Sequence, residues 1–398
     1  MRLLRLYLPC EPPLSTVDAP RKGDGEEEEE MKAVKQAGDF LVTTSPHITH
    51  PLNTSSIMWS VSACLIPAGV WGVYIFGIRA LLVVCVSIAA AVGGELIIGK
   101  VLKRQFTIGD GSAFLTGLLV GYNMPPAIPV YIPIVASLFA IVVVKWTFGG
   151  LGSNWMNPAL AGRVFVFFSW TGPMANWTLP RTINPDIVSG ATPLGFIKAG
   201  LVNYSGGAAG PADFLAKNDF AHTLLDERVT GWFREHLFSD MQYGYADLFV
   251  GNVGGCIGEV SALFLLIGTI YLFARKIISW HIPVSYIVSF GLFTWIFGGT
   301  RFGAGFFQGD VLFNIFAGGL ILGAFYMATD MVTSPLTGKG MIIFGIGAGV
   351  FTFLIRFYGS FPEGVSLAII LMNIFVPLIN RLTGPKKFGE VPKEESAT

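Results

Sequence analysis

Long apolar runs constrain the fold of this chain more than any other feature. Several of them, such as residues 78–99 and 278–298, reach about the 20 residues that an α-helix needs to cross the hydrocarbon core of a bilayer. The chain is 52% hydrophobic and only 13% charged, whereas a soluble domain carries roughly 25% charged residues. Because a backbone in lipid must satisfy its own hydrogen bonds, we predict an all-α integral membrane protein.

The apolar runs predict about ten spans, with boundaries that are soft by about 2–4 residues. They lie at 55–76, 78–99, 110–125, 127–145, 155–170, 250–274, 278–298, 310–329, 340–357 and 362–380. A large polar loop, residues 171–248, separates a first five-helix repeat (55–170) from a second (250–380). Residues 1–54 and 381–398 form the terminal tails.

Internal repetition indicates that the two halves are related. Three short segments recur at an offset of about 200 residues: Val61-Ser-Ala63 with Val260-Ser-Ala262, Gly109-Asp110 with Gly309-Asp310, and Gly117-Leu-Leu-Val-Gly121 with Gly319-Leu-Ile-Leu-Gly323. An odd number of spans in each half places the halves in opposite orientations. We therefore predict two inverted repeats, as in many transport proteins.

The third and eighth spans look interrupted at matching positions. The third ends in Tyr122-Asn-Met-Pro-Pro126, and the eighth leads into Ala328-Thr-Asp-Met-Val-Thr-Ser-Pro335. A break leaves backbone N–H and C=O groups without their helical hydrogen bonds, and within the membrane such groups are tolerated where they line a cavity. Breaks at matching positions of two repeats therefore predict a central site. The alternative is a pair of ordinary kinked helices packed on their neighbours.

Basic residues in the short loops predict the orientation. With a cytoplasmic N-terminus, the inner side carries Lys100, Lys103, Arg104, Lys145, Arg275, Lys276, Lys339, Arg381, Lys386 and Lys387, and the outer side carries Arg79, Arg301 and Arg356. We expect a multi-pass protein of the cell inner membrane with both termini in the cytoplasm and the large loop outside.

The N-terminus allows two interpretations. Residues 21–30 end in a run of five glutamates directly before Met31. Like charges repel and bury nothing, which is typical of a solvated tail. Alternatively residues 1–30 are not translated and Met31 is the start, because a purine-rich ribosome-binding site read in frame gives Gly, Glu and Lys.

Composition excludes several classes of function. None of Cys10, Cys64, Cys85 and Cys256 stands in a Cys-x-x-Cys pair, so the chain alone offers no iron–sulfur or zinc framework. Lys+Arg and Asp+Glu balance at 26 each, and no basic stripe with interleaved aromatic residues points to nucleic acid.

The large loop carries a candidate attachment site, Ser189-Gly190-Ala191-Thr192, followed by Pro193. Gly190 permits a tight turn, and the small neighbours leave room beside the Thr192 hydroxyl for a bulky phosphate ester. The alternative interpretation is a plain surface turn.

Longer segments give this motif its context. The chain resembles the D subunits of Rnf electron transport complexes from about Phe40 to Arg381. The resemblance rests on Ser45-Pro-His-Ile48, Asn157-Pro-Ala-Leu-Ala-Gly-Arg-Val-Phe165, Ser189-Gly-Ala-Thr192, Pro362-Glu-Gly-Val365 and Leu371-Met-Asn-Ile-Phe-Val-Pro-Leu378. The related B subunits of sodium-pumping NADH:quinone reductases resemble the chain less at Ser-Pro-His.

This resemblance implies that the Thr192 hydroxyl is esterified by the phosphate of FMN through a dedicated flavin transferase. It also implies a six-subunit complex, with partner subunits A, B, C, E and G, that oxidises ferredoxin, reduces NAD⁺ and moves Na⁺ or H⁺. Additional flavin in the membrane is expected, with riboflavin in this subunit as one candidate.

Arg163 is a charge within an apolar span, which is costly in lipid and usually functional. Its guanidinium offers a fixed fork of donors to the phosphate or reduced ring of a flavin. The alternative is a structural ion pair with a carboxylate such as Glu95.

Four acids, Glu95, Asp110, Asp310 and Asp330, lie in or beside the spans. Asp110 and Asp310 occupy matching repeat positions, and symmetric helix N-caps are the interpretation that we favour for them. A role for any of the four in a cation pathway is the other hypothesis.

We therefore predict a flavin-carrying electron-relay subunit of an ion-translocating ferredoxin:NAD⁺ oxidoreductase, not a complete enzyme. Two alternatives stay open: the corresponding B subunit of a sodium-pumping quinone reductase, and a channel or transporter for urea or ammonium that holds no flavin.

Overall fold

In the computed structural model, the chain divides into two compact units, residues 1–51 and 52–398. The structure describes residues 53–103, 108–181, 190–201, 208, 210–218, 220, 222–236, 243–361 and 363–384, all in the second unit. The predicted tail at 1–30 with its alternative start at Met31, the segment Ser45–Ile48 and Ser189 lie outside these residues.

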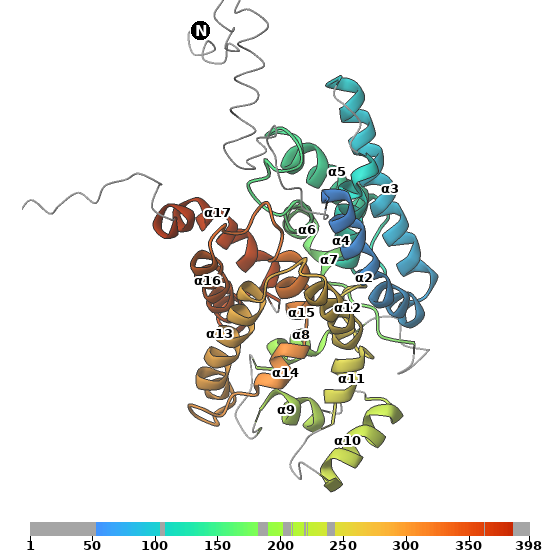
Figure 1. Ribbon diagram of the computed structural model, residues 1–398. Helices are drawn as coiled ribbons and strands as arrows, with labels where there is room; N and C mark the ends of the chain where they lie inside the picture. The colour runs from blue at the N-terminus through green and yellow to red at the C-terminus, as the bar shows by residue number, and fades with distance from the viewer. Residues whose placement is uncertain are drawn as a thin grey trace, which may run out of the picture. The chain divides into compact units, whose positions relative to one another are not determined.

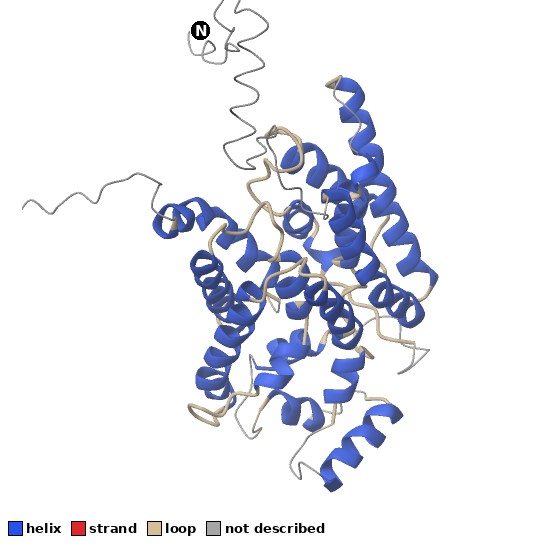
Figure 2. Ribbon diagram, in the orientation of Figure 1, coloured by secondary structure: helices blue, strands red, loops and turns tan. Residues whose placement is uncertain are grey.

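The described part of the chain is helical, and no strand occurs in it apart from one isolated bridge between Trp177 and Gly190 (Figures 1 and 2). The first half contains α2 (Thr54–Phe76), α3 (Ile78–Val101), η1 (Ile108–Asp110), α4 (Ser112–Tyr122), α5 (Tyr131–Leu138) with its π-helical continuation η2 (Phe139–Lys145), and α6 (Pro158–Ser169). The loop contains α7 (Thr171–Met174), α8 (Pro193–Gly200), α9 (Pro211–Lys217), α10 (Leu224–His236) and α11 (Tyr245–Val250).

The second half contains α12 (Ala262–Ala274), α13 (His281–Phe297) with η4 (Gly298–Phe302), α14 (Val311–Phe316), α15 (Leu320–Leu322) with η5 (Gly323–Met327), α16 (Gly338–Phe357) and α17 (Val365–Thr383). Among the described residues, five helices are long and apolar enough to cross a membrane, and four shorter apolar helices accompany them. Side chains such as Val70, Ile97 and Ile270 are more than half exposed, as expected for a surface that faces lipid. The chain is a multi-pass, all-helical membrane protein, and the count of ten spans stays a prediction.

Two of the predicted spans are not single helices. The run at 250–274 becomes helical only at Ala262, because a glycine-rich segment precedes it and Ser261 caps the helix by accepting from the Phe264 N–H at 3.4 Å. The run at 310–329 divides into α14, α15 and η5. Its break falls at Gly318, whose φ of +73° is a left-handed conformation that favours glycine.

The predicted interruption of the third span is present, because helix α4 ends at Tyr122, before Asn123 and the Pro125-Pro126 pair. In the eighth span, η5 ends at Met327, before the predicted segment Ala328–Pro335, which is not helical. A further break at Gly318, just after α14, was not predicted. Proline lacks a backbone donor and cannot continue the hydrogen-bond ladder, which explains the first break.

Two tyrosines make the same contact in the two halves. The Tyr122 hydroxyl donates to the Leu65 carbonyl at 2.8 Å, and the Tyr326 hydroxyl donates to the Leu265 carbonyl at 2.8 Å. A glycine, Gly69 or Gly268, leaves the space for each ring, since an added Cβ would lie 2.0 Å or 2.3 Å from the tyrosine oxygen. This shared contact supports the prediction of two related halves.

The main hydrophobic core draws on both halves. Helix α2 packs against α12, α6 packs against α17, and α13 packs against α16. A second, smaller core lies between the loop helices and the second half, where Leu194 and Ile197 of α8 gather with Phe214, Phe302 and Phe313. This smaller core fixes α8, which carries the predicted attachment site at its N-terminus.

Close helix packing depends on glycine at chosen positions. In Gly162→Ala, the new Cβ would lie 2.5 Å from the Ala136 carbonyl oxygen, so α6 must move. We expect a loss of about 1–3 kcal/mol, measured as a lower melting temperature of the detergent-purified protein. Gly93→Ala on α3 is the control, because an added Cβ there meets nothing within 4 Å. Equal melting temperatures for the two variants would contradict this packing.

Candidate functional site

A buried cluster of charges lies where the two halves meet. Arg163 stands in α6, whose N-cap Asn157 accepts from the Ala159 and Leu160 N–H groups at 3.0 and 3.4 Å. The Arg163 side chain is only 7% exposed. A guanidinium at such a position requires partners, because burying an unpaired charge is very costly.

Two carboxylates supply the balancing charge. Arg163 Nη2 donates to Glu363 Oε2 at 2.5 Å, and Arg163 Nη1 lies 3.1 Å from Glu259 Oε1. Nη1 also donates to Asn123 Oδ1 at 3.0 Å and to Ser366 Oγ at 2.6 Å. The guanidinium thus joins the break after α4, the segment before α12 and the start of α17.

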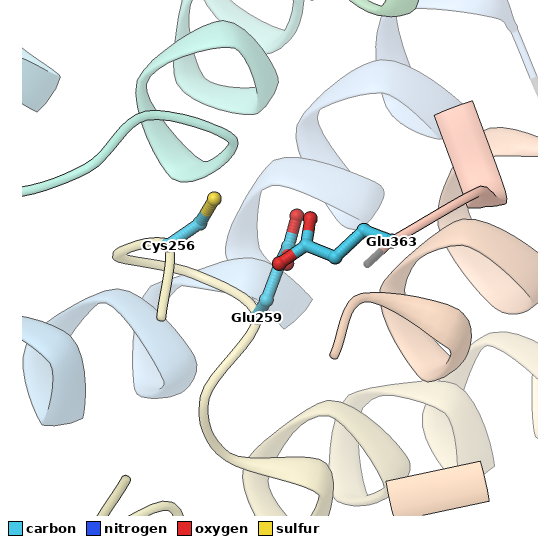
Figure 3. Close-up of side chains that lie close together, drawn as sticks. All are labelled: Cys256, Glu259 and Glu363. Atoms are coloured by element: carbon cyan, nitrogen blue, oxygen red, sulfur yellow. The ribbon is translucent and has the colours of Figure 1, made fainter. Parts of the chain in front are cut away.

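Cys256 completes the cluster. Figure 3 shows Cys256 and Glu259 on the segment before α12, with the Glu259 carboxyl group beside that of Glu363. The Cys256 thiol donates to the Asn123 carbonyl at 3.4 Å and accepts from Arg163 Nη2 at 3.5 Å. The ligand atoms of these three residues lie within 4.8 Å of one another, as metal ligands do. Because Arg163 already lies within ion-pair distance of both carboxylates, we interpret the arrangement as an ion-pair cluster.

Glu259 is short of hydrogen bonds within this cluster. Glu259 is 5% exposed, and neither of its carboxylate oxygens has a hydrogen-bond partner among the described residues. The attraction of Arg163 is its compensation. The carboxylate keeps unused capacity to accept a donor from a bound molecule.

Thr192 is the N-cap of α8, and Pro193 occupies the first turn of that helix. The Thr192 Oγ1 atom accepts from the Gly195 N–H at 3.0 Å. Before it, the Gly190 N–H donates to the Trp177 carbonyl at 3.0 Å, and a Cβ at Gly190 would lie 2.7 Å from the Leu179 side chain. Gly190 is therefore required by close packing, and Thr192 stands at a helix N-terminus.

A cavity connects Thr192 with the charge cluster, and we call it the Thr192 cavity. Its lining includes Thr192, Gly254, Gly255, Gly318, Glu259 and Glu363. Thr192 is only 4% exposed, and the cavity beside its side chain is small, with a free volume of about 20 Å³. The glycines keep side chains out of that space.

The predicted acid Glu95 belongs to a different cluster. The Lys145 ammonium group donates to both Glu95 carboxylate oxygens at 2.9 Å and to Ser112 Oγ at 2.6 Å. The alternative interpretation of Arg163 as a structural ion pair with a carboxylate is confirmed, with Glu259 and Glu363 as its partners. Glu95, which was the example given, is not among them, because Lys145 at the end of η2 neutralises Glu95.

The other three acids each accept hydrogen bonds near a helix end or a turn. Asp310 is the N-cap of α14 and accepts from the Phe313 N–H at 3.0 Å and from the Tyr245 hydroxyl. The N-cap interpretation is confirmed for Asp310. Asp110 precedes the N-cap of α4, Gly111, and accepts from the Ser112 N–H at 2.7 Å. The N-cap interpretation of Asp110 is therefore wrong by one residue.

Asp330 accepts from the Thr333 hydroxyl at 3.0 Å and lines a second cavity together with Asn154, Asn157 and Lys145. This cavity does not include Thr192 or Arg163 among its described lining residues. Ser112 also lines this cavity; its hydroxyl accepts from Lys145 and donates to Asp110 Oδ1 at 2.6 Å. The structure therefore brings Asp330 and, through Lys145 and Ser112, Glu95 and Asp110 to one cavity, whereas Asp310 is not among its described lining residues.

Comparison with known proteins identifies the family. Residues 41–389 match the model of the NQR2, RnfD, RnfE family. The chain is 44% identical over 350 residues to the D subunit of the proton-translocating ferredoxin:NAD(+) oxidoreductase complex of Clostridium ljungdahlii, covering 88% of this chain and 96% of that protein. It is 40% identical over 364 residues to the Na(+)-translocating counterpart of Acetobacterium woodii, covering 90% of this chain and 99% of that protein.

The chain belongs to the NQR2, RnfD, RnfE family. A third relative, the D subunit of the ion-translocating oxidoreductase complex of Stutzerimonas stutzeri, is 35% identical over 337 residues, which are 84% of this chain and 91% of that protein.

The sequence did not predict Glu259 and Glu363 as partners of Arg163. Both stand in segments that drew attention for other reasons, Glu259 directly before Val260-Ser-Ala262 and Glu363 within Pro362-Glu-Gly-Val365.

Removal of Arg163 tests the cluster. Arg163→Met leaves two buried carboxylates side by side without a compensating charge, and we expect a loss of about 3–5 kcal/mol. Glu259→Gln added to this variant should recover part of the melting temperature, because it removes one uncompensated charge. Arg79→Met, on an exposed side chain at the start of α3, is the control. A wild-type melting temperature in Arg163→Met would show that the cluster contributes nothing to stability.

Proposed function

We propose that this protein is the D subunit of an ion-translocating ferredoxin:NAD⁺ oxidoreductase complex of the Rnf type, and that it relays electrons through FMN bound covalently to Thr192. The names of the relatives support the first part. The chain covers at least 91% of each of the three relatives described above.

The position of Thr192 supports the second part. A phosphate ester on the Thr192 hydroxyl would lie at the N-terminus of α8, where unpaired N–H groups and the helix dipole favour negative charge. The Gly195 N–H, which now donates to Oγ1 at 3.0 Å, is one such donor. This observation carries the proposal.

The Thr192 cavity has a free volume of about 20 Å³, so it leaves room for the point of attachment, and the ring of an attached flavin would lie beyond it or displace its wall. Gly254, Gly255 and Gly318 form part of its wall and present no side chains to it, while Glu259 and Glu363 lie at its charged end. When bound, a flavin supplies the ability to take electrons singly or in pairs. The protein supplies position and a fixed arrangement of charges.

Arg163 and its partners determine the electrostatics beside the cavity. The guanidinium holds Glu363 by a hydrogen bond and balances Glu259. Neither Glu259 oxygen has a hydrogen-bond partner among the described residues, although Oε1 lies 3.1 Å from Arg163 Nη1. Arg163 itself is committed to the carboxylates, Asn123 and Ser366, so its proposed contact with the flavin would be indirect.

Location and partners follow from the same proposal. The excess of Lys and Arg in one set of short loops supports an inner-membrane subunit with cytoplasmic termini and Thr192 on the outer side. A flavin transferase would attach the FMN, and subunits A, B, C, E and G would complete the complex. Riboflavin as a second flavin and membrane lipid around the spans belong to the same proposal. The names of the relatives include both proton and Na⁺ translocation, so the coupling ion is left open.

Fluorescence of the denatured protein tests the attachment. The full chain, expressed with its flavin transferase, should give a fluorescent flavin band on a denaturing gel, and Thr192→Ala should lose it completely. Thr337→Ala is a matched control, because Thr337 caps α16 and its Oγ1 also accepts from a glycine N–H at 3.0 Å.

The two threonine variants lose the same kind of helix cap, worth about 1 kcal/mol. A difference between them in flavin content therefore reports attachment and not stability. A flavin band that survives in Thr192→Ala would place the ester on another residue. A band absent from the wild type would favour the transporter alternative.

A further inference from the structure

A second cavity on the side of α8 carries positive charge that the proposed electron relay does not use. We call it the basic cavity. It lies between α8, the end of α16 and the start of α14, and its lining includes Lys198, Arg301, Arg356, Asn314, Phe302 and Phe313. No acidic side chain is among the described residues that line it.

Arg356 is the most unusual of these residues. It is 5% exposed, and its Nη1 donates to the Asn314 carbonyl at 2.5 Å. Its Nε and Nη2 atoms have no hydrogen-bond partner among the described residues. Buried donors without acceptors are costly. The Phe290 ring, whose centre lies 5.0 Å from the guanidinium carbon, and the charges of Glu363 and Glu259 stabilise the guanidinium in part. In proteins, the edge formed by Nε and Nη2 commonly binds two oxygens of a phosphate or carboxylate at once.

Lys198 is held beside Arg356. Its ammonium group donates to the carbonyls of Arg356 and Phe361 at 3.1 and 2.6 Å, which leaves one of its three N–H donors. Burial, and then the charges of Arg301 and Arg356, lower the pKa of the Lys198 amine to about 8. The cavity therefore concentrates positive charge that an anion would stabilise.

The surroundings indicate where that anion comes from. Exposed aromatic side chains near this end of α13 and α16 include Trp295, Phe306, Phe307 and Tyr358, which are 48%, 61%, 56% and 60% exposed. The Arg301 guanidinium lies 5.5 Å from the centre of the Tyr358 ring. Aromatic side chains gather at the level of the lipid head groups in membrane proteins.

We propose that Lys198, Arg301 and Arg356 form a binding site for a phosphate group, supplied by the head group of an anionic phospholipid. The Nε and Nη2 edge of Arg356 binds two phosphate oxygens, and Lys198 and Arg301 complete the charge. The acyl chains extend along the exposed apolar surface of the spanning helices. The site would tie α8, and with it Thr192, to the membrane surface.

Lipid binding to the full-length, detergent-purified protein tests this site. Native mass spectrometry would follow titration with phosphatidylglycerol, with phosphatidylcholine and with inorganic phosphate. We expect one tightly bound phosphatidylglycerol per chain, and binding weaker by about tenfold or more in Arg356→Gln and in Lys198→Met, because each removes a charge-assisted hydrogen bond. Arg79→Gln, an exposed arginine at the end of another spanning helix, should bind as the wild type does.

Comparison of the three ligands shows whether the bound phosphate group comes from a lipid or from free phosphate. Binding of phosphatidylglycerol that both variants weaken supports the lipid site. Binding of inorganic phosphate alone, weakened in the same variants, supports the phosphate site and assigns its ligand to free phosphate. Lys198→Met, on a half-buried side chain, keeps the test decisive if Arg356→Gln fails to fold. Wild-type affinity in a folded Lys198→Met variant, or no binding of any probe, would overturn the proposal.

Discussion

The structure depends most on the ion pairs of Arg163 with Glu259 and Glu363. A guanidinium in the interior of a membrane protein is tolerated only when opposite charge and acceptors surround it. Here the partners come from the break after α4, from the segment before α12 and from the start of α17. Each of these segments must take one conformation for the charge to be balanced, so the cluster couples the two halves to each other.

The interrupted helices make this cluster possible. A continuous helix through residues 112–130 would keep Asn123 within its backbone ladder, whereas the break places the Asn123 side chain against Arg163 and its carbonyl against the Cys256 thiol. In the second half, the turn at Gly318 leaves space beside Glu363 and Leu194. The breaks thus supply both the acceptors of the cluster and the wall of the Thr192 cavity.

Helix α8 connects the loop with this arrangement. Its N-terminus presents Thr192 to the cavity, its apolar face packs in the smaller core, and Lys198 near its C-terminus bonds to the carbonyls of Arg356 and Phe361. A group bound at Thr192 and an anion bound in the basic cavity would therefore act on the same short helix. This gives a physical route by which the membrane surface would influence the position of a flavin.

The sequence by itself determined the features that depend on neighbouring residues. Apolar runs predicted the helices, Pro125-Pro126 predicted the break after α4, and Asp310 was correctly interpreted as an N-cap. Sequence also singled out Thr192 and Arg163, through a motif and through the cost of charge in lipid. Only the tertiary structure decided the partners, because Arg163 and Glu363 are 200 residues apart. Whether Arg163 binds Glu95 or Glu259 depends on how the halves pack, and no local pattern encodes that distance.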